Sequence, residues 1–174
     1  SIAHSGALTD EMHKLMAQKG VWRAGTETPM GLAGHPVSQQ AYQRTVASLK
    51  NAYENRVPLT FSTDADYWVA GKTRGEVCLE FIKVWQDAGI PIADTLRAMT
   101  INGYKVSGTE KTRGPIAAGF FADIIAVTGN PLESLDALKD VPFVMKNGLV
   151  FKKEGVMTPA AFFNGGPVNG WLIR

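Results

Sequence analysis

The clearest structural signal in the chain is the stretch Pro58-Leu59-Thr60-Phe61-Ser62-Thr63-Asp64-Ala65-Asp66. Apolar and β-branched residues run into a polar segment with two carboxylates, a pattern typical of a buried parallel strand that ends in a functional loop. Asp64 is therefore expected at the carboxyl end of this strand. Parallel α/β folds build their sites at that end, where a carboxylate can bind a metal or accept a proton. Asp64 could equally cap the turn that follows.

Two strand-helix units are predicted before this strand. The first joins residues 1–6 to a helix that Thr9 caps and Gly20 ends; the second joins residues 21–24 to a helix that begins at Ser38. Residues 30–37, with two glycines and a proline, should form a loop. Helical spacing predicts two apolar helix faces, made of Leu8, Met12, Leu15 and Met16 in the first helix and Tyr42, Val46, Leu49 and Tyr53 in the second.

Two further helices are predicted after the strand. One covers about residues 73–88 and is ended by Gly89, and the next follows Pro91 through Val106. Strands alternating with helices indicate a parallel α/β architecture, with too few units to close a barrel. The inward side chains of the helix over 73–88 are predicted to be Val77, Phe81, Val84, Trp85 and Ala88.

Beyond Ser107 the pattern changes to short strands. They are predicted at residues 114–116, 122–127, 143–146 and 149–152, and Asn147-Gly148 between the last two is a strong hairpin signal. A small antiparallel sheet is expected here. Three aromatic residues are expected to pack the tail onto the body of the protein: Phe162, Phe163 and Trp171.

Composition limits the class of protein. The 174 residues are 45% hydrophobic, which suits one substantial core, and the net charge of +2 comes from mixed charges without a basic stripe, so nucleic acid is not expected as a partner. No apolar run is long enough to span a membrane. The single cysteine, Cys78, lies in a helical pattern and is expected to be a buried structural thiol rather than a nucleophile.

Five segments occur in an order that resembles the metal-dependent amidohydrolase superfamily, in particular its imidazolonepropionase-like and dipeptidase-like members. The matching segments are residues 2–6 with the helix start at 8–11, residues 20–21 leading into a threonine-rich loop, residues 62–65, residues 88–91 through 98–103, and residues 114–124. The resemblance implies the C-terminal portion of a (β/α)8 TIM-like barrel plus part of a small β-sandwich. In this reading residues 1–107 are the last strand-helix units of the barrel, residues 108–155 a sandwich segment and residues 156–174 a packed tail.

The resemblance also implies a site. His4 matches the family's metal-binding histidine of the sixth strand, and Asp64 matches its aspartate of the eighth strand, which binds metal and takes the proton from the attacking water. One or two divalent ions, zinc in particular, are the expected cofactor. Thr26, His35 and Asp66 are candidate substrate-binding residues, and Glu27 is a further candidate for the pocket.

Several family ligands have no counterpart in this chain. The His-x-His of the first strand, the bridging lysine or acidic ligand and the histidine of the fifth strand are absent, and Arg74-Gly75 stands where many relatives have His-Gly. The expectation is therefore a peptidase-like hydrolase that cleaves an amide, peptide or cyclic C–N bond in a small molecule. An N-terminal segment or chain of the same enzyme would complete the metal site, in an oligomeric assembly.

Two alternatives stay open at this point. One is a self-processed hydrolase in which the α-amino group of Ser1 is the base for its own hydroxyl. The other is a non-catalytic binding or assembly module that keeps the C-terminal half of the fold. The remaining polar residues are expected to be structural: His13 as a solvated or partly packed helix residue, Asp123 in the sandwich, and Glu76 and Glu80 on a helix surface.

Overall fold

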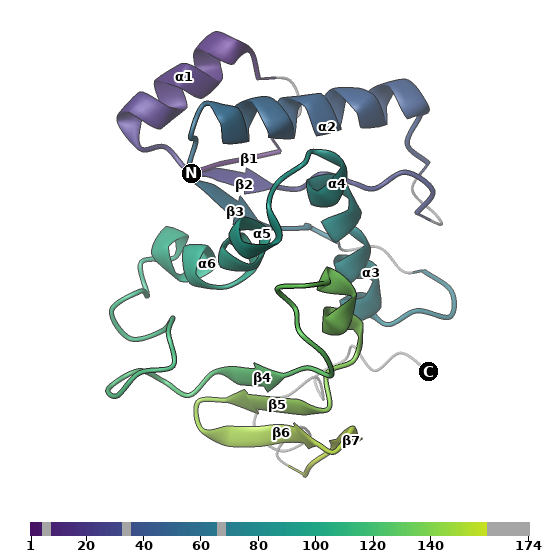
Figure 1. Cartoon of the computed structure of the whole chain (residues 1–174), viewed down its shortest axis with the longest axis vertical. Helices are drawn as coiled ribbons and strands as arrows, with labels where there is room; N and C mark the ends of the chain where they lie inside the picture. Colours follow the sequence, from purple (N-terminus) through teal and green to yellow (C-terminus); the bar gives the residue numbers. More distant parts are fainter. Residues whose placement is uncertain (5–7, 33–35, 66–68, 160–174) are drawn as a thin grey trace. The chain divides into compact units, whose positions relative to one another are not determined.

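The computed structural model describes residues 1–4, 8–32, 36–65 and 69–159, and the chain divides into two compact units, residues 1–107 and 108–174. The first unit contains a parallel three-stranded sheet with helices, and the second contains an antiparallel four-stranded sheet (Figure 1). The predicted mixture of a parallel α/β part and a separate antiparallel sheet is confirmed.

The parallel sheet has the strand order β1-β2-β3, formed by β1 (Ile2–Ala3), β2 (Arg23–Gly25) and β3 (Leu59–Phe61). Both pairs are parallel, with Ala3 opposite Ala24 and Ala24 opposite Thr60. Because the strands run in one direction, their carboxyl ends lie at the same edge. The residues that follow these ends are therefore brought together.

Helices α1 (Asp10–Lys19) and α2 (Gln39–Glu54) lie on one side of this sheet (Figure 1). The predicted N-cap of α1 is confirmed, since Thr9 accepts a hydrogen bond from the Met12 amide. The predicted start of α2 at Ser38 is confirmed as well, and Ser38 is its N-cap, with its side chain accepting from the Ala41 amide. The predicted apolar face of α2 is confirmed too: Tyr42 and Leu49 are buried, and Val46 and Tyr53 pack against the same cluster.

The predicted inward face of α1 is wrong in part. Met12 and Leu15 are exposed, whereas Met16 and His13 are buried, so His13 is not the solvated or partly packed residue that the sequence suggested. The physical reason is a set of polar partners for the imidazole on α2 and β2, which makes its burial possible without an unpaired polar group.

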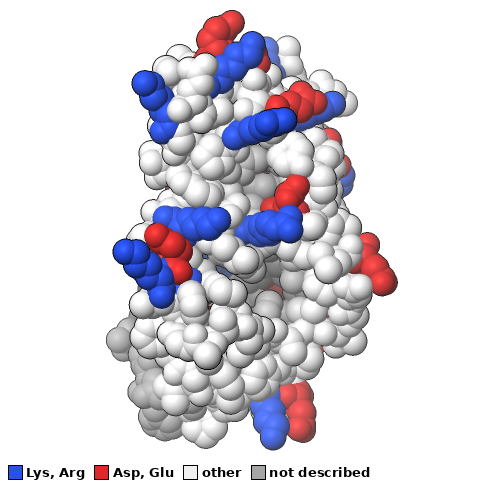
Figure 2. Space-filling model, turned by 60° about the vertical axis from the view of Figure 1, so that its left-hand side comes forward, with Lys and Arg blue, Asp and Glu red and all other residues white. Residues whose placement is uncertain are grey.

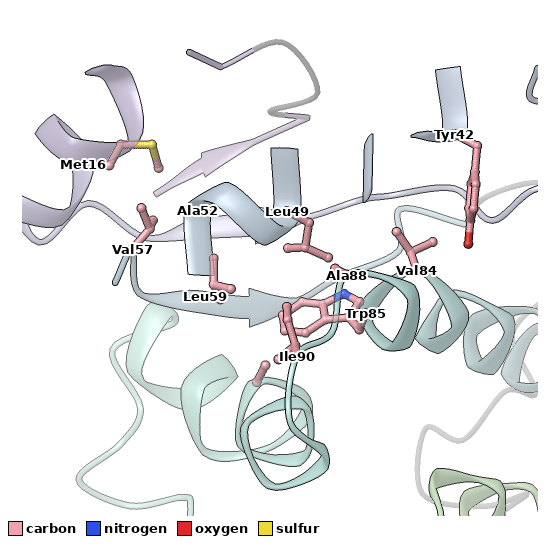
Figure 3. Close-up of a cluster of buried hydrophobic side chains, with 11 residues drawn as sticks. Met16, Tyr42, Leu49, Ala52, Val57, Leu59, Val84, Trp85, Ala88 and Ile90 are labelled. Carbon is pink, nitrogen blue, oxygen red and sulfur yellow. The ribbon is translucent and has the colours of Figure 1, made fainter. Parts of the chain in front are cut away.

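The main apolar core joins α2, β3 and α4 (Figure 3). Leu49 and Ala52 of α2 meet Leu59 of β3, and Trp85 of α4 fills the space beside them. The Phe61 and Trp85 rings lie 5.7 Å apart between centroids, in a tilted arrangement that is favourable for aromatic pairs. This packing fixes β3, and with it the start of the loop that carries Asp64.

The two helices predicted after β3 are each divided. The first consists of α3 (Arg74–Glu80) and α4 (Ile82–Asp87), and the second of α5 (Ile92–Met99) and α6 (Ile101–Val106). At Phe81 the backbone hydrogen bonds span three residues instead of four. The Phe81 amide donates to the Cys78 carbonyl, and the Val84 amide donates to the Phe81 carbonyl. The predicted inward residues are confirmed as buried: Val77, Phe81, Val84, Trp85 and Ala88.

The second unit has the strand order β4-β5-β6-β7, all antiparallel, with a 3-10 helix, η1, between β4 and β5. The hairpin at Asn147-Gly148 is confirmed, since both residues have positive φ. The bounds are β4 (Ile124–Ala126), η1 (Leu135–Lys139), β5 (Phe143–Lys146), β6 (Leu149–Lys153) and β7 (Val156–Met157).

One predicted strand of this unit is wrong. Residues 114–116 form bends, because the chain around them is closed locally: the Phe121 amide donates to the Thr112 carbonyl at 2.9 Å. Asp123 is structural here, as it pairs with Arg113 and accepts a hydrogen bond of 2.9 Å from the Asn147 amide at the hairpin turn. The aromatic residues of the predicted packed tail, Phe162, Phe163 and Trp171, lie outside the described residues.

Charged residues of both signs are mixed on the face of the molecule seen in Figure 2. Among the described residues, oppositely charged side chains form ion pairs such as Lys14 with Asp10 and Arg97 with Asp94. Across the described part of the chain, no helix combines the length and the apolar character needed to cross a bilayer.

A pair of glycine substitutions tests the turn that ends α1. Gly20 has a φ of +63° with open space around the position of a Cβ atom, so Gly20→Ala adds only backbone strain and should lower the free energy of unfolding by about 1–2 kcal/mol. The matched control is Gly75→Ala in α3, where φ is not positive. Alanine there should raise the free energy of unfolding by about 0.5 kcal/mol. Chemical denaturation measures both; equal effects would contradict the left-handed cap.

Candidate active site

Three polar side chains meet where the three parallel strands end. His4 follows β1, Thr26 follows β2, and Asp64 comes shortly after β3. The Nε2 atom of His4 lies 2.9 Å from Oδ2 of Asp64, and its Nδ1 atom lies 3.3 Å from Oγ1 of Thr26. The sheet thus brings together side chains that are far apart in the sequence, at the edge where parallel folds build their sites.

The backbone turns sharply at two of these residues. His4 has a φ of +54° and Asp64 a φ of +47°, so both lie in the left-handed region. Histidine and aspartate occur there more often than most residues, but the conformation is still uncommon, and such residues cluster at functional sites. Here the turn at His4 follows β1 directly, and the turn at Asp64 comes three residues after the end of β3.

Stability alone does not explain the contact between His4 and Asp64. Their side chains are 67% and 63% exposed, and polar pairs this open to solvent contribute little to folding. Both groups are therefore accessible to a ligand from solvent. The pair is therefore a candidate ligand site.

The chemistry of these donors agrees in part with the zinc that the sequence resemblance implies. An imidazole nitrogen and a carboxylate oxygen are both common zinc ligands, but a catalytic zinc usually has three protein ligands. Within the described ranges, no three His, Cys, Asp or Glu side chains are grouped closely enough to hold a metal ion. His4 and Asp64 therefore fit as part of a ligand set.

A buried polar network lies behind the sheet edge. The Arg23 guanidinium donates to Glu27 Oε1 at 2.8 Å and to the Ser48 carbonyl at 2.8 Å, and its Nη1 lies 3.2 Å from His13 Nε2. Because a guanidinium can only donate, His13 Nε2 accepts, and the His13 Nδ1–H donates to Asn51 Oδ1 at 2.5 Å.

The outer end of this network is Asp10. It accepts hydrogen bonds from Asn51 at 2.8 Å and Asn55 at 2.9 Å and pairs with Lys14. The bond to Lys14, followed by those to the two amides, holds the pKa of Asp10 well below its usual range, so it stays ionised. The network joins α1, α2 and β2 through charge-assisted bonds.

Sequence reasoning missed this network. Its one visible signal is an arginine inside the apolar run of residues 21–24, with a glutamate four residues later. A charged residue in a buried strand needs a partner, and Glu27 is within reach. Glu27, a candidate pocket residue from the sequence, is turned toward Arg23 and is buried. Two other predicted residues, His35 and Asp66, lie outside the described residues.

A cavity of about 490 Å³ lies at the opposite end of β3 from Asp64. Pro58 and Leu59 at the amino end of the strand line it, with Tyr53, Asp94 and Arg97 from the neighbouring helices. Tyr53 donates to Asp94 at 2.7 Å, and Arg97 donates to the same carboxylate at 2.8 Å. Asp94 and Arg97 are thus paired with each other, and neither His4 nor Asp64 lines this cavity.

Comparison with known proteins gives a consistent result. Residues 2–150 match the model of the amidohydrolase family. The chain is 25% identical over 130 residues to a 5-methylthioadenosine/S-adenosylhomocysteine deaminase of Halothermothrix orenii, over 72% of this chain and 28% of the deaminase.

Solved structures agree in fold. A Xaa-Pro dipeptidase with methionine bound in its active site is 24% identical, with a TM-score of 0.72 over 87% of this chain and 39% of the dipeptidase. An ochratoxinase of A. niger is 25% identical, with a TM-score of 0.69 over 88% of this chain and 37% of the ochratoxinase. The chain thus spans less than half the length of these relatives.

Proposed function

The chain belongs to the amidohydrolase family, and on this premise we propose that it forms the C-terminal part of a metal-dependent hydrolase that cleaves an amide, peptide or cyclic C–N bond. Residues 1–107 would be the last strand-helix units of a (β/α)8 barrel, and residues 108–155 a segment of its β-sandwich. The remaining metal ligands would come from an N-terminal segment or chain of the same enzyme.

One observation supports the proposal most directly. His4 and Asp64, from two strands of a parallel sheet, lie 2.9 Å apart at its carboxyl edge and are open to solvent. Family membership supports metal binding as the role of this pair, since amidohydrolases are typically metal-dependent. The same pair in an unrelated protein would carry far less weight, because fold and function are separable.

In the proposed reaction, His4 and Asp64 would hold the ion together with ligands from elsewhere. When bound there, a zinc ion would supply a water of lowered pKa and Lewis-acid polarisation of the substrate carbonyl. Asp64 would accept a proton as water adds to the carbonyl carbon and would deliver it to the leaving nitrogen as the C–N bond breaks. Hydrolysis of an amide or peptide gives a carboxylic acid and an amine, and hydrolysis of a cyclic amide gives both groups in one ring-opened molecule.

The names of the relatives indicate a broad substrate class, compounds with a hydrolysable C–N bond. The relatives include a deaminase and a Xaa-Pro dipeptidase, whose names describe C–N bonds of different kinds. We propose a small-molecule amide or peptide as the substrate. His35 and Asp66 stay candidates for substrate binding.

Native mass spectrometry followed by denaturing mass spectrometry tests the proposal. We expect the 18.8 kDa chain together with further polypeptide, and an added mass that fits one or two zinc ions. A chelator should remove both the added mass and any amidase or dipeptidase turnover, and zinc should restore them. A species of 18.8 kDa or its multiples without metal would overturn the proposal and favour the binding-module alternative.

A further inference from the structure

The two ring nitrogens of His4 face different partners. Nε2 is directed at Asp64, and Nδ1 is 3.3 Å from the Thr26 hydroxyl. Thr26 comes from the loop after the central strand β2, between the strands that carry the other two residues. The His4 imidazole is therefore contacted at Nδ1 by the loop that follows the neighbouring strand.

The orientation of Thr26 is set by the residues on either side of it. Arg23 is directed toward α1 and α2, since its partners there are His13 and the Ser48 carbonyl. The Glu27 side chain is directed toward Arg23 as well, because its Oε1 accepts a hydrogen bond from the guanidinium at 2.8 Å.

Gly25 makes this orientation of the Glu27 side chain possible. A Cβ atom at position 25 would lie 2.2 Å from Glu27 Oε2, so the carboxylate occupies the space where a side chain would be. Glu27 is thus folded over Gly25 onto Arg23. Thr26 between them reaches the other way, to His4, as residues alternate in an extended chain.

We propose that Thr26 is a positioning residue for His4, held in place by the Arg23–Glu27 pair that folds over Gly25. This proposal rests on the proposed function of His4 as a metal ligand. In this proposal Thr26 orients the His4 imidazole, whereas the sequence suggested that Thr26 contacts substrate.

A hydroxyl suits both states of the imidazole. When Nε2 binds a metal, the ring proton is on Nδ1 and donates to Thr26 Oγ1, which fixes the tautomer that ligation needs. Without a metal, the Nε2–H can donate to Asp64, and the Thr26 hydroxyl can donate to Nδ1. Threonine serves in both cases because its hydroxyl donates and accepts.

The test measures zinc affinity of the complete protein by competition with a chelator. Thr26→Val, which keeps the shape but removes the hydroxyl, should weaken zinc binding by about 10- to 100-fold. Thr26→Ser should keep the wild-type affinity, and so should Thr28→Val in the same loop. Unchanged affinity in Thr26→Val would overturn the proposal. His4→Ala separates the two hypotheses: if it too binds zinc like the wild type, the proposed metal site itself is wrong.

A second readout needs no metal. In the metal-free protein, nitrogen NMR of the histidine rings should show a shift of the His4 Nδ1 resonance in Thr26→Val and its recovery in Thr26→Ser. His13, held by Asn51 and Arg23, is an internal control for folding, and its resonances should not move. A His4 Nδ1 resonance that is the same in Thr26→Val and wild type would contradict the contact.

Discussion

Asp64→Asn should reduce turnover by about 100- to 10,000-fold while the protein stays folded and assembled. Asparagine keeps the size of the side chain and one acceptor oxygen, but it cannot take a proton from water and is a weaker metal ligand. Asp64→Ala, which removes both oxygens, should abolish turnover. Because the side chain is 63% exposed and its ion-pair partner His4 is also exposed, neither change should alter the free energy of unfolding much.

Asp136→Asn is the matched control for this experiment. Asp136 is 75% exposed and forms an ion pair with Lys139, so it resembles Asp64 in exposure and in pairing but lies in η1 of the other unit. Initial rates on a panel of Xaa-Pro dipeptides and other small amides, with native mass spectrometry to check assembly, measure the effect. Undiminished turnover in Asp64→Asn would exclude Asp64 as the proton acceptor.

Local signals in the sequence predicted most elements of the fold. The threonine at position 9 and the glycine at position 20 mark the ends of α1, and Asn147-Gly148 marks the hairpin, because each of these residues satisfies a backbone requirement of its own. The division of the predicted helices at Phe81 and Thr100 was missed. It changes hydrogen-bond spacing over one turn while the apolar periodicity continues, so the pattern of side chains gives no sign of it.

Long-range polar contacts were beyond the reach of periodicity. On α1, Met12 and Leu15 predicted an inward face, yet the helix buries His13, whose partners come from α2 and β2. For the site, the strand ending near Asp64 could be inferred from its residues, and a parallel sheet requires strand ends to share an edge. That His4 meets Asp64 at this edge depends on strand order, which the sequence does not state; its role there remains a proposal.

The largest expected loss of stability comes from Glu27→Ala. Arg23 and Glu27 are 1% and 6% exposed, and burial lowers the pKa of the Arg23 guanidinium while the Glu27 charge opposes this shift. Removing the carboxylate leaves a buried cation without its counter-ion, which should cost about 3–5 kcal/mol in the free energy of unfolding. The loss arises from the unpaired charge, because such pairs contribute little net stability when both charges are replaced together.

Two further variants separate this cause from a simple loss of contacts. The double variant Arg23→Met with Glu27→Leu removes both charges and should be more stable than Glu27→Ala, although it deletes more hydrogen bonds. Glu54→Ala is the control, since Lys50 and Glu54 have the same spacing in sequence but are 59% and 60% exposed, and its effect should be small. Urea unfolding gives all three values. If Glu27→Ala and Glu54→Ala were equally stable, the Arg23–Glu27 pair would not anchor β2, and the positioning of Thr26 would need another explanation.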